Sequence, residues 1–170
     1  MATNEIYFAA GCFWGAQKFF KRVPGVISTE VGFANGNTDN PTYKEVYTDT
    51  TGYAEAVRVA YDTDCVQLAD LVRLFFKAID PLSVNRQGED EGTRYRTGIY
   101  FVLQSQVEPI ESVVAEVEAA LGCRTAVEIL PLHNFTKAEE YHQDYLDKNP
   151  GGYCHLSPAI FELARSFRKL

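Results

Sequence analysis

The residues best suited to chemistry lie in the segment GCFWG (11–15), which follows the apolar run 6–10. A cysteine at a strand-to-helix turn lies beside unpaired backbone N–H groups, and the helix dipole there favours the thiolate. Phe13 and Trp14, the only tryptophan of the chain, would add apolar surface around the sulfur. Free cysteine is also commonly buried as a small apolar residue. The flanking glycines nevertheless favour a nucleophile at Cys12, because an inert core cysteine needs no such backbone freedom.

A second candidate is Glu55, in an alternating segment that predicts a strand over 53–61. Period two places Glu55 on one face with Val57, Val59 and Tyr61, while Arg58 faces the other way. If the first face is the core, burial raises the pKa of the Glu55 carboxyl and allows it to hold a proton near neutral pH. A strand-end glutamate that faces water fits the spacing equally well.

Three further residues lie in loop segments. Tyr43 follows Pro41-Thr42, Tyr95 lies in GTRYR (92–96), and Asp90 lies in the acidic, glycine-rich segment RQGEDEG (86–92). A phenol in such a position can direct its O–H into a cleft, and Asp90 can organise the loop and a nearby tyrosine hydroxyl. Half-buried packing tyrosines and a solvated connecting loop fit the same patterns.

The remaining cysteines differ in their surroundings. Cys154 ends KNPGGYC (148–154), a strong turn signal that predicts a mobile loop over about 147–156. Near a reactive Cys12, a thiol on such a loop would act as a resolving cysteine; the alternative is an incidental loop residue. Cys65 and Cys123 lack such features and are interpreted as packing or incidental residues, with Cys123 as a weak substitute thiol.

Composition excludes several classes of protein. The chain has 170 residues and a net charge of -7, which fits a single domain over 1–170 and disfavours nucleic acid or an anionic membrane as partner. No zinc-type spacing of cysteine and histidine occurs, so we expect no metal. The first residues show no secretory signal pattern, and no segment has the length of a membrane span. We therefore expect a cytoplasmic protein.

Periodicity and turn signals predict helices that pack on a mixed β-sheet. We expect an α/β (α+β) fold, a ferredoxin-like two-layer sandwich with an extended C-terminal segment. The predicted strands are 5–10, 26–33, 53–61, 98–103 and 125–130, and the predicted helices are 14–22, 42–47, 68–79, 107–121, 137–146 and a terminal helix that starts at Ser157-Pro158.

Several segments together resemble the A-type peptide methionine sulfoxide reductases. They are GCFWG (11–15), NPTYKEV (40–46), GYAEAV (52–57), RQGEDEGTRYR (86–96), EYHQDYL (140–146) and NPGGYC (149–154). They occur in the family's order and cover nearly the whole chain. Three departures, Tyr53, Phe33 and Glu89, stand where the family usually has other residues, and none removes a chemical group from the reaction.

The resemblance implies reduction of the S epimer of methionine sulfoxide, free or in proteins, as repair of oxidative damage. Cys12 would attack the sulfoxide sulfur and become a sulfenic acid, which Cys154 would convert into a disulfide. Glu55 would give a proton to the sulfoxide oxygen, and Tyr43 and Tyr95 would hydrogen-bond it. Phe13 and Trp14 would hold the S-methyl group, and Asp90 would line the site. Thioredoxin or another dithiol would reduce the disulfide of a monomer without a further cofactor.

Two other functions use some of the same residues. A cysteine hydrolase or acyl-transfer enzyme would use Cys12 with a histidine base, and all three histidines lie in the last quarter of the chain. A module that only binds oxidised methionine would keep the aromatic residues and need neither cysteine. Turnover without a reductant would indicate the hydrolase, and a disulfide formed on contact with a sulfoxide would exclude the passive binder.

Overall fold

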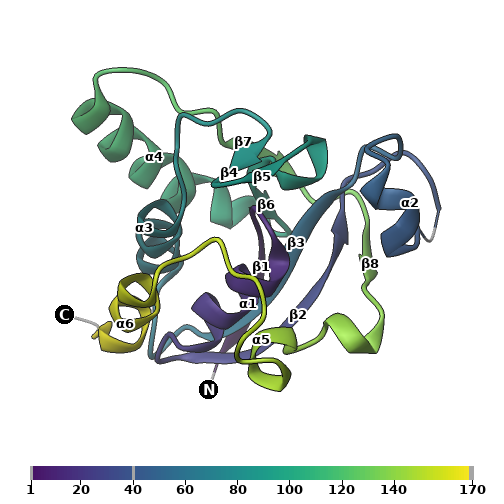
Figure 1. The fold of residues 1–170 in the computed structure, drawn as a ribbon. Coiled ribbons are helices and arrows are strands. Elements are labelled where there is room, and N and C mark those ends of the chain that lie inside the picture. The colour runs from purple at the N-terminus through teal and green to yellow at the C-terminus, as the bar shows by residue number, and fades with distance from the viewer. Residues whose placement is uncertain (1, 40, 169–170) are drawn as a thin grey trace.

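The computed structural model describes residues 2–39 and 41–168, so Asn40 lies outside the described residues (Figure 1). In chain order the elements are β1 (Thr3–Ala10), α1 (Phe13–Lys21), β2 (Val26–Ala34), α2 (Tyr43–Tyr47), β3 (Ala54–Asp62), α3 (Leu68–Ala78), β4 (Arg86–Gln87), β5 (Asp90–Glu91), η1 (Thr93–Tyr95), β6 (Thr97–Phe101), η2 (Gln104–Gln106), α4 (Val107–Leu121), β7 (Glu128–Pro131), β8 (Phe135–Lys137), η3 (Glu140–His142), α5 (Tyr145–Lys148) and α6 (Pro158–Ser166).

Six strands form one sheet in the order β7-β6-β1-β3-β2-β8. Neighbouring strands are antiparallel except β6 and β7, which are parallel. The mixed α/β fold predicted from the sequence is therefore confirmed. The ferredoxin-like assignment stays a prediction, although the order β1-α1-β2-β3-α3-β6 is compatible with it.

The main core lies between the sheet and the helices α1, α3, α4 and α6. At its centre the ring of Phe8 stacks on Phe20 and Phe75, with centroid distances of 4.5 and 5.2 Å. Together the three rings tie β1 to α1 and α3, so the loop between β1 and α1 leaves the core from a rigid base.

The alternation predicted for β3 is confirmed. Val57 and Val59 belong to the core on the helix side, and Ala54 and Ala56 pack on the opposite face of the sheet. Glu55 is buried on the helix side, 2% exposed. Arg58 faces the other way, toward two glutamates of the neighbouring strands.

The helix predicted over 137–146 is wrong. The structure has the end of β8, the turn η3 and the start of α5 in this segment. Gln143 explains why. Its buried side-chain amide accepts a hydrogen bond from the N–H of Val31 on β2 and donates one to the carbonyl of Val31, at 2.9 Å each, and it also donates to the carbonyl of Ala138. The next residue, Asp144, has a φ of 54°, which a continuous helix excludes. The strand predicted from residue 125 begins at Glu128.

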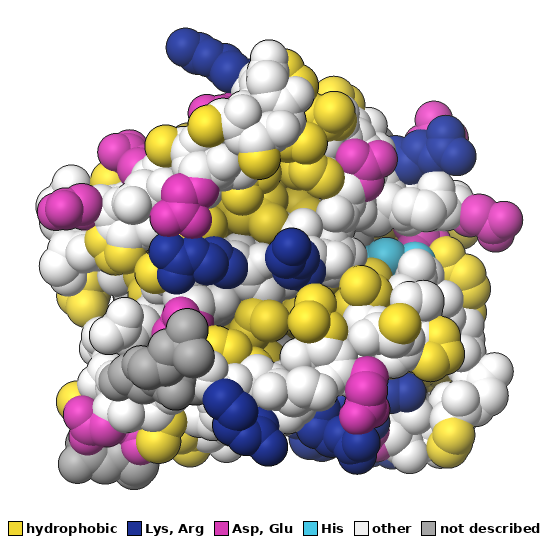
Figure 2. Space-filling view, turned by 90° about the vertical axis from the view of Figure 1, so that its left-hand side faces the viewer, with side chains coloured by type: hydrophobic (Ala, Val, Ile, Leu, Met, Phe, Trp, Pro, Cys, Tyr) yellow, Lys and Arg dark blue, Asp and Glu magenta, His cyan; other side chains and the backbone are white. Residues whose placement is uncertain are grey.

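A groove of about 390 Å³ lies between α3 and α4 on the side opposite β8. Figure 2 shows apolar atoms in this hollow between charged side chains. Within the described ranges, no helix has both the length and the apolar character that a membrane crossing requires.

Candidate active site

Cys12 is the N-cap residue of α1 and follows a tight turn at Gly11. Gly11 has a φ of +80°, and a Cβ atom there would lie 2.8 Å from the Cβ of Gln87. Both observations require glycine at this position. The turn brings the Cys12 sulfur to the backbone N–H groups of Trp14 and Gly15, which lower the pKa of the thiol. The strand-to-helix turn predicted from the sequence is therefore present.

The net effect on the thiol differs from the sequence prediction of a stabilised thiolate. Cys12 is only 6% exposed. Burial, followed by the charge of Glu55, raises its pKa well above the ordinary value, and the two N–H groups offset this only in part. The free protein therefore holds Cys12 as a thiol at neutral pH, because desolvation outweighs the helix terminus.

Glu55 contacts the backbone of the residue that follows the nucleophile. Its Oε1 accepts a hydrogen bond from the backbone N–H of Phe13 at 3.1 Å. Burial raises the pKa of the carboxyl to about 8, although the Phe13 N–H and Arg94 both lower it. The carboxyl is thus protonated in most molecules at neutral pH, as the buried alternative in the sequence required.

Tyr43 on α2 precedes Glu55 in the sequence, and Tyr95 on η1 follows it. The fold brings both phenols to the Glu55 carboxyl. Burial raises the pKa of each phenol, and the charges of Glu55 and Cys12 raise it further. Both hydroxyls therefore remain protonated and lie within electrostatic range of the nucleophile and the acid.

Arg94 was not predicted from the sequence. Its Nη1 donates to Asp49 at 2.6 Å and to the carbonyl of Tyr47, and its guanidinium lies over the rings of Tyr47 and Tyr95. The side chain therefore fixes the loop that carries Tyr95. Only its position between Asp90 and Tyr95 in RQGEDEGTRYR could have indicated a place near the site.

The Trp14 side chain is held by two residues from the segment after β8. Its Nε1 donates to Nδ1 of His142 at 3.0 Å, and its ring stacks on Tyr145 with a centroid distance of 3.8 Å. The His142 ring also lies 5.3 Å from Phe13 and stacks on Tyr43 at 4.4 Å. The aromatic residues of the candidate site thus form one contiguous wall.

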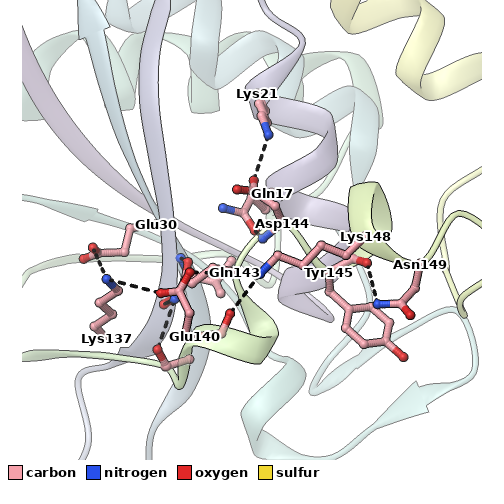
Figure 3. Close-up of polar contacts among 12 residues, drawn as sticks. Gln17, Lys21, Glu30, Lys137, Glu140, Gln143, Asp144, Tyr145, Lys148 and Asn149 are labelled. Atoms are coloured by element: carbon pink, nitrogen blue, oxygen red, sulfur yellow. Dashed lines mark hydrogen bonds and ion pairs between the residues drawn. The ribbon is translucent and has the colours of Figure 1, made fainter.

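Polar contacts fix this segment on α1 (Figure 3). Gln17 accepts from the backbone N–H of Asp144 at 2.8 Å, and Lys21 pairs with the Asp144 carboxylate at 2.9 Å. Both partners come from the same helix as Trp14. The contacts therefore set the position of His142 and Tyr145 relative to the tryptophan, a place for His142 that no local pattern predicts.

Cys154 reaches the site from the C-terminal segment. A Cβ on Gly15 would lie 3.1 Å from the Cys154 sulfur and 3.2 Å from the ring of His155. The N–H of Gly15 also contacts the Cys12 sulfur. The two thiols therefore lie next to the same residue of α1, Gly15. No disulfide joins Cys12 and Cys154 in this structure.

Asp90 lies on the short hairpin β4-β5, where the sequence left a solvated loop as an alternative. Burial raises the pKa of its carboxyl, and the Tyr153 hydroxyl and His155 lower it. The side chain is 14% exposed. The structure therefore brings together Cys12, Glu55, Tyr43, Tyr95, Phe13, Trp14, Asp90 and Cys154, the residues predicted from the sequence.

The comparisons with known proteins agree with this arrangement. The family model described as peptide methionine sulfoxide reductase matches residues 4–168. A relative from Lachnoclostridium phytofermentans, named peptide methionine sulfoxide reductase MsrA, is 49% identical over 96% of this chain and 99% of its own.

Solved structures show the same fold. Mxr1 from Saccharomyces cerevisiae in its reduced form superposes with a TM-score of 0.86 at 35% identity and covers 91% of each chain. A structure of Mxr1 in complex with Trx2 has a TM-score of 0.60 at 22% identity over 84% of each chain, which shows the fold alone. With a family model that spans nearly its full length and a relative of almost equal size, this chain belongs to the peptide methionine sulfoxide reductase family.

Proposed function

We propose that the chain reduces the S epimer of methionine sulfoxide, free or in proteins, and so repairs oxidative damage in the cytoplasm. The observation that carries the proposal is the pair Cys12 and Glu55, a buried thiol beside a carboxyl that is protonated in most molecules at neutral pH. A sulfoxide oxygen leaves readily only when protonated, so the reaction needs both groups at one place. Family membership supports the same reaction.

The first step transfers two electrons from the cysteine sulfur. The Cys12 sulfur attacks the substrate, the sulfur–oxygen bond of the sulfoxide breaks, and the oxygen ends on Cys12 as a sulfenic acid. Glu55 gives its proton to the oxygen and regains one from the Cys12 thiol, so that no net proton is consumed. Methionine leaves. Because the thiol pKa is raised in the free protein, this proton exchange is part of the activation of the nucleophile.

The surrounding residues would hold the substrate. Tyr43 and Tyr95 keep their protons, so each can donate a hydrogen bond to the sulfoxide oxygen as charge develops on it. Phe13 and Trp14 would enclose the S-methyl group, and Asp90 would line the remaining side. An apolar methyl pocket opposite two oxygen donors accepts one epimer, which is the expected pattern of one enzyme per epimer.

The second step forms a disulfide between Cys12 and Cys154 and releases water. Thioredoxin or another dithiol then reduces this disulfide, so two cysteines and an external dithiol supply all the electrons and no metal or organic cofactor is needed. Yeast Mxr1, whose reduced form is 35% identical to this chain, has been solved in complex with Trx2, which supports a thioredoxin as the donor. We propose that the chain acts as a monomer and binds neither nucleic acid nor membranes.

A single-turnover assay tests the proposal. Reduced protein is mixed with pure S or pure R methionine sulfoxide without a reductant, and methionine and free thiols are counted. We expect one methionine per chain and the loss of two thiols with the S epimer, and none with the R epimer. Cys12→Ser should form no methionine, whereas Cys123→Ser, which changes an exposed cysteine, should behave like the wild type. Sustained turnover of a thioester without a reductant would instead support a hydrolase.

A further inference from the structure

The side chain of His155 lies between the nucleophile turn, the resolving cysteine and Asp90, and the proposed reaction has not used it so far. The side chain is 2% exposed, although the residue belongs to an irregular segment. A Cβ on Gly11 would lie 3.1 Å from its Nε2, and a Cβ on Gly15 would lie 3.2 Å from its Nδ1. The imidazole therefore fills the notch that the two glycines leave on either side of Cys12.

The hydrogen bond of Nε2 fixes the tautomer of the ring. Nε2 lies 3.1 Å from the carbonyl oxygen of Ala10. A carbonyl only accepts, so Nε2 carries the hydrogen and Nδ1 presents a lone pair. Among the described residues, neither Nδ1 of His155 nor Oδ2 of Asp90 has a hydrogen-bond partner, and these two buried atoms lie 4.0 Å apart.

This pair of atoms is arranged to receive a proton. A lone pair that faces a carboxylate oxygen is unfavourable, whereas a protonated Nδ1 at the same place would be stabilised by the Asp90 charge. Cys154, the residue before His155, places its sulfur 3.1 Å from the same Gly15 Cβ position that lies 3.2 Å from Nδ1. Both atoms therefore lie beside the same point on α1, so the thiol of Cys154 can supply a proton to Nδ1 in the second step.

We propose that His155 is the base of the resolving step: its Nδ1 takes the proton of Cys154 as this sulfur attacks the sulfenic acid of Cys12, and Asp90 stabilises the imidazolium. The inference rests on the function proposed above and concerns only its second step. It assigns a chemical part to a histidine outside the residues that act on the sulfoxide.

Atoms and charges balance in this step. The Cys154 sulfur forms a bond to the Cys12 sulfur, the bond between Cys12 and the sulfenic oxygen breaks, and the departing hydroxide takes the proton from Nδ1 to leave as water. Cys154 is oxidised and Cys12 is reduced from sulfenic acid to disulfide. His155 returns to its neutral form with Nε2 still bonded to Ala10.

The surrounding charges suit this cycle. Burial lowers the pKa of His155, while Asp90 and the carbonyl of Ala10 raise it, so the ring is neutral and ready to accept a proton at pH 7. The groups that act on Asp90 in turn are Tyr153 and Arg94, which lower the pKa of its carboxyl, and Glu89, which raises it. Of these groups, Asp90 is the acidic one whose charge acts on the His155 imidazole directly.

The experiment follows both steps in one mixing with methionine-S-sulfoxide and no dithiol. Methionine is measured by quenched chromatography, and disulfide formation by the loss of two hydrogens in the intact mass. His155→Gln keeps an amide hydrogen for the Ala10 carbonyl and removes the base; His133→Gln, at an exposed histidine, is the matched control. At pH 7 we expect His155→Gln to slow disulfide formation at least tenfold relative to methionine formation, and His133→Gln to leave this ratio unchanged.

The pH profile separates a base from a residue that merely docks the segment. At higher pH, hydroxide can remove the thiol proton without a protein base, so the disulfide rates of His155→Gln and the wild type should converge toward pH 9. An unchanged ratio at pH 7, or a gap of equal size at every pH, would overturn the inference. If the variant forms no methionine, the pH profile of the wild type tests the inference instead. Its rate of disulfide formation should level off above pH 7. A tenfold rise of this rate per pH unit up to 8.5 would contradict a histidine base. Absence of methionine from the wild type would instead reject the proposed function.

Discussion

Oε1 of Glu55 accepts a hydrogen bond from the backbone N–H of Phe13 at 3.1 Å. The bond joins the centre of the sheet to the first residue of α1, directly after Cys12. It uses one of the N–H groups that a helix leaves free at its start. The side chain of Glu55 is therefore held by the backbone of the residue next to Cys12, which keeps the acid close to the nucleophile.

Replacing Glu55 with glutamine should remove the proton donor and keep this bond, because the amide oxygen can accept from Phe13. We expect methionine formation in a single turnover to slow by at least 10²-fold, with little change in the sulfoxide concentration that gives half-maximal rate. Glu30→Gln is the control, since Glu30 faces Arg58 on the other side of the sheet. An unchanged rate in Glu55→Gln would mean that another group donates the proton.

Glu55→Gln should also raise the free energy of unfolding relative to the wild type, by an amount that grows with pH. Folded Glu55 titrates at about 8, whereas an unfolded glutamate titrates near 4.3. Between these values the folded chain binds the extra proton, so its free energy of unfolding falls as the pH rises. Glu55→Gln lacks this loss and should gain on the wild type by a few kcal/mol from pH 5 to 8. Urea unfolding of both reduced proteins at pH 5 and 8 measures the difference; equal slopes with pH would contradict the buried carboxyl.

Cys154→Ser should separate the two halves of the reaction. We expect one methionine per chain, as in the wild type, followed by no internal disulfide and at least tenfold slower cycling with thioredoxin. Cys123→Ser should cycle normally, because this residue lies exposed beyond the end of α4. Full cycling of Cys154→Ser combined with loss in Cys123→Ser would transfer the resolving part to Cys123.

Gly11→Ala should destabilise the nucleophile turn by more than backbone strain alone. Gly11 and Gly122 have φ values of +80° and +75°, so alanine at either site costs about 1 kcal/mol. Only at Gly11 would the new Cβ approach another atom, 2.8 Å from Gln87. We expect Gly11→Ala to lose at least about 1 kcal/mol more than Gly122→Ala in thermal or urea unfolding. Equal losses would show that the turn can relax.

Local patterns predicted most of the elements and the positions of the chemical groups. The alternation around Glu55 placed it on the face shared with Val57 and Val59, because a strand has a fixed period of two. The glycines around Cys12 predicted the strand-to-helix turn for a similar reason, since few backbones fit that geometry.

The errors arose where distant contacts decide the outcome. The segment after Phe135 pairs with β2 and is held by Gln143 on Val31, and neither contact is visible in local periodicity. The pKa of Cys12 had the opposite direction to the sequence prediction, because its burial and its distance from Glu55 depend on the whole fold. His142, His155 and Arg94 were missed for the same reason: their partners lie 45 or more positions away in the chain.

The step on which the proposed reaction depends is the transfer of the sulfoxide oxygen to the Cys12 sulfur, and labelling can test it. Cys154→Ser is mixed with methionine-S-sulfoxide and a reagent that labels only sulfenic acids, and peptides are mapped by mass spectrometry. We expect one label per methionine released, on Cys12. Methionine released with Cys12 unlabelled and still a thiol would show that the oxygen does not pass to Cys12.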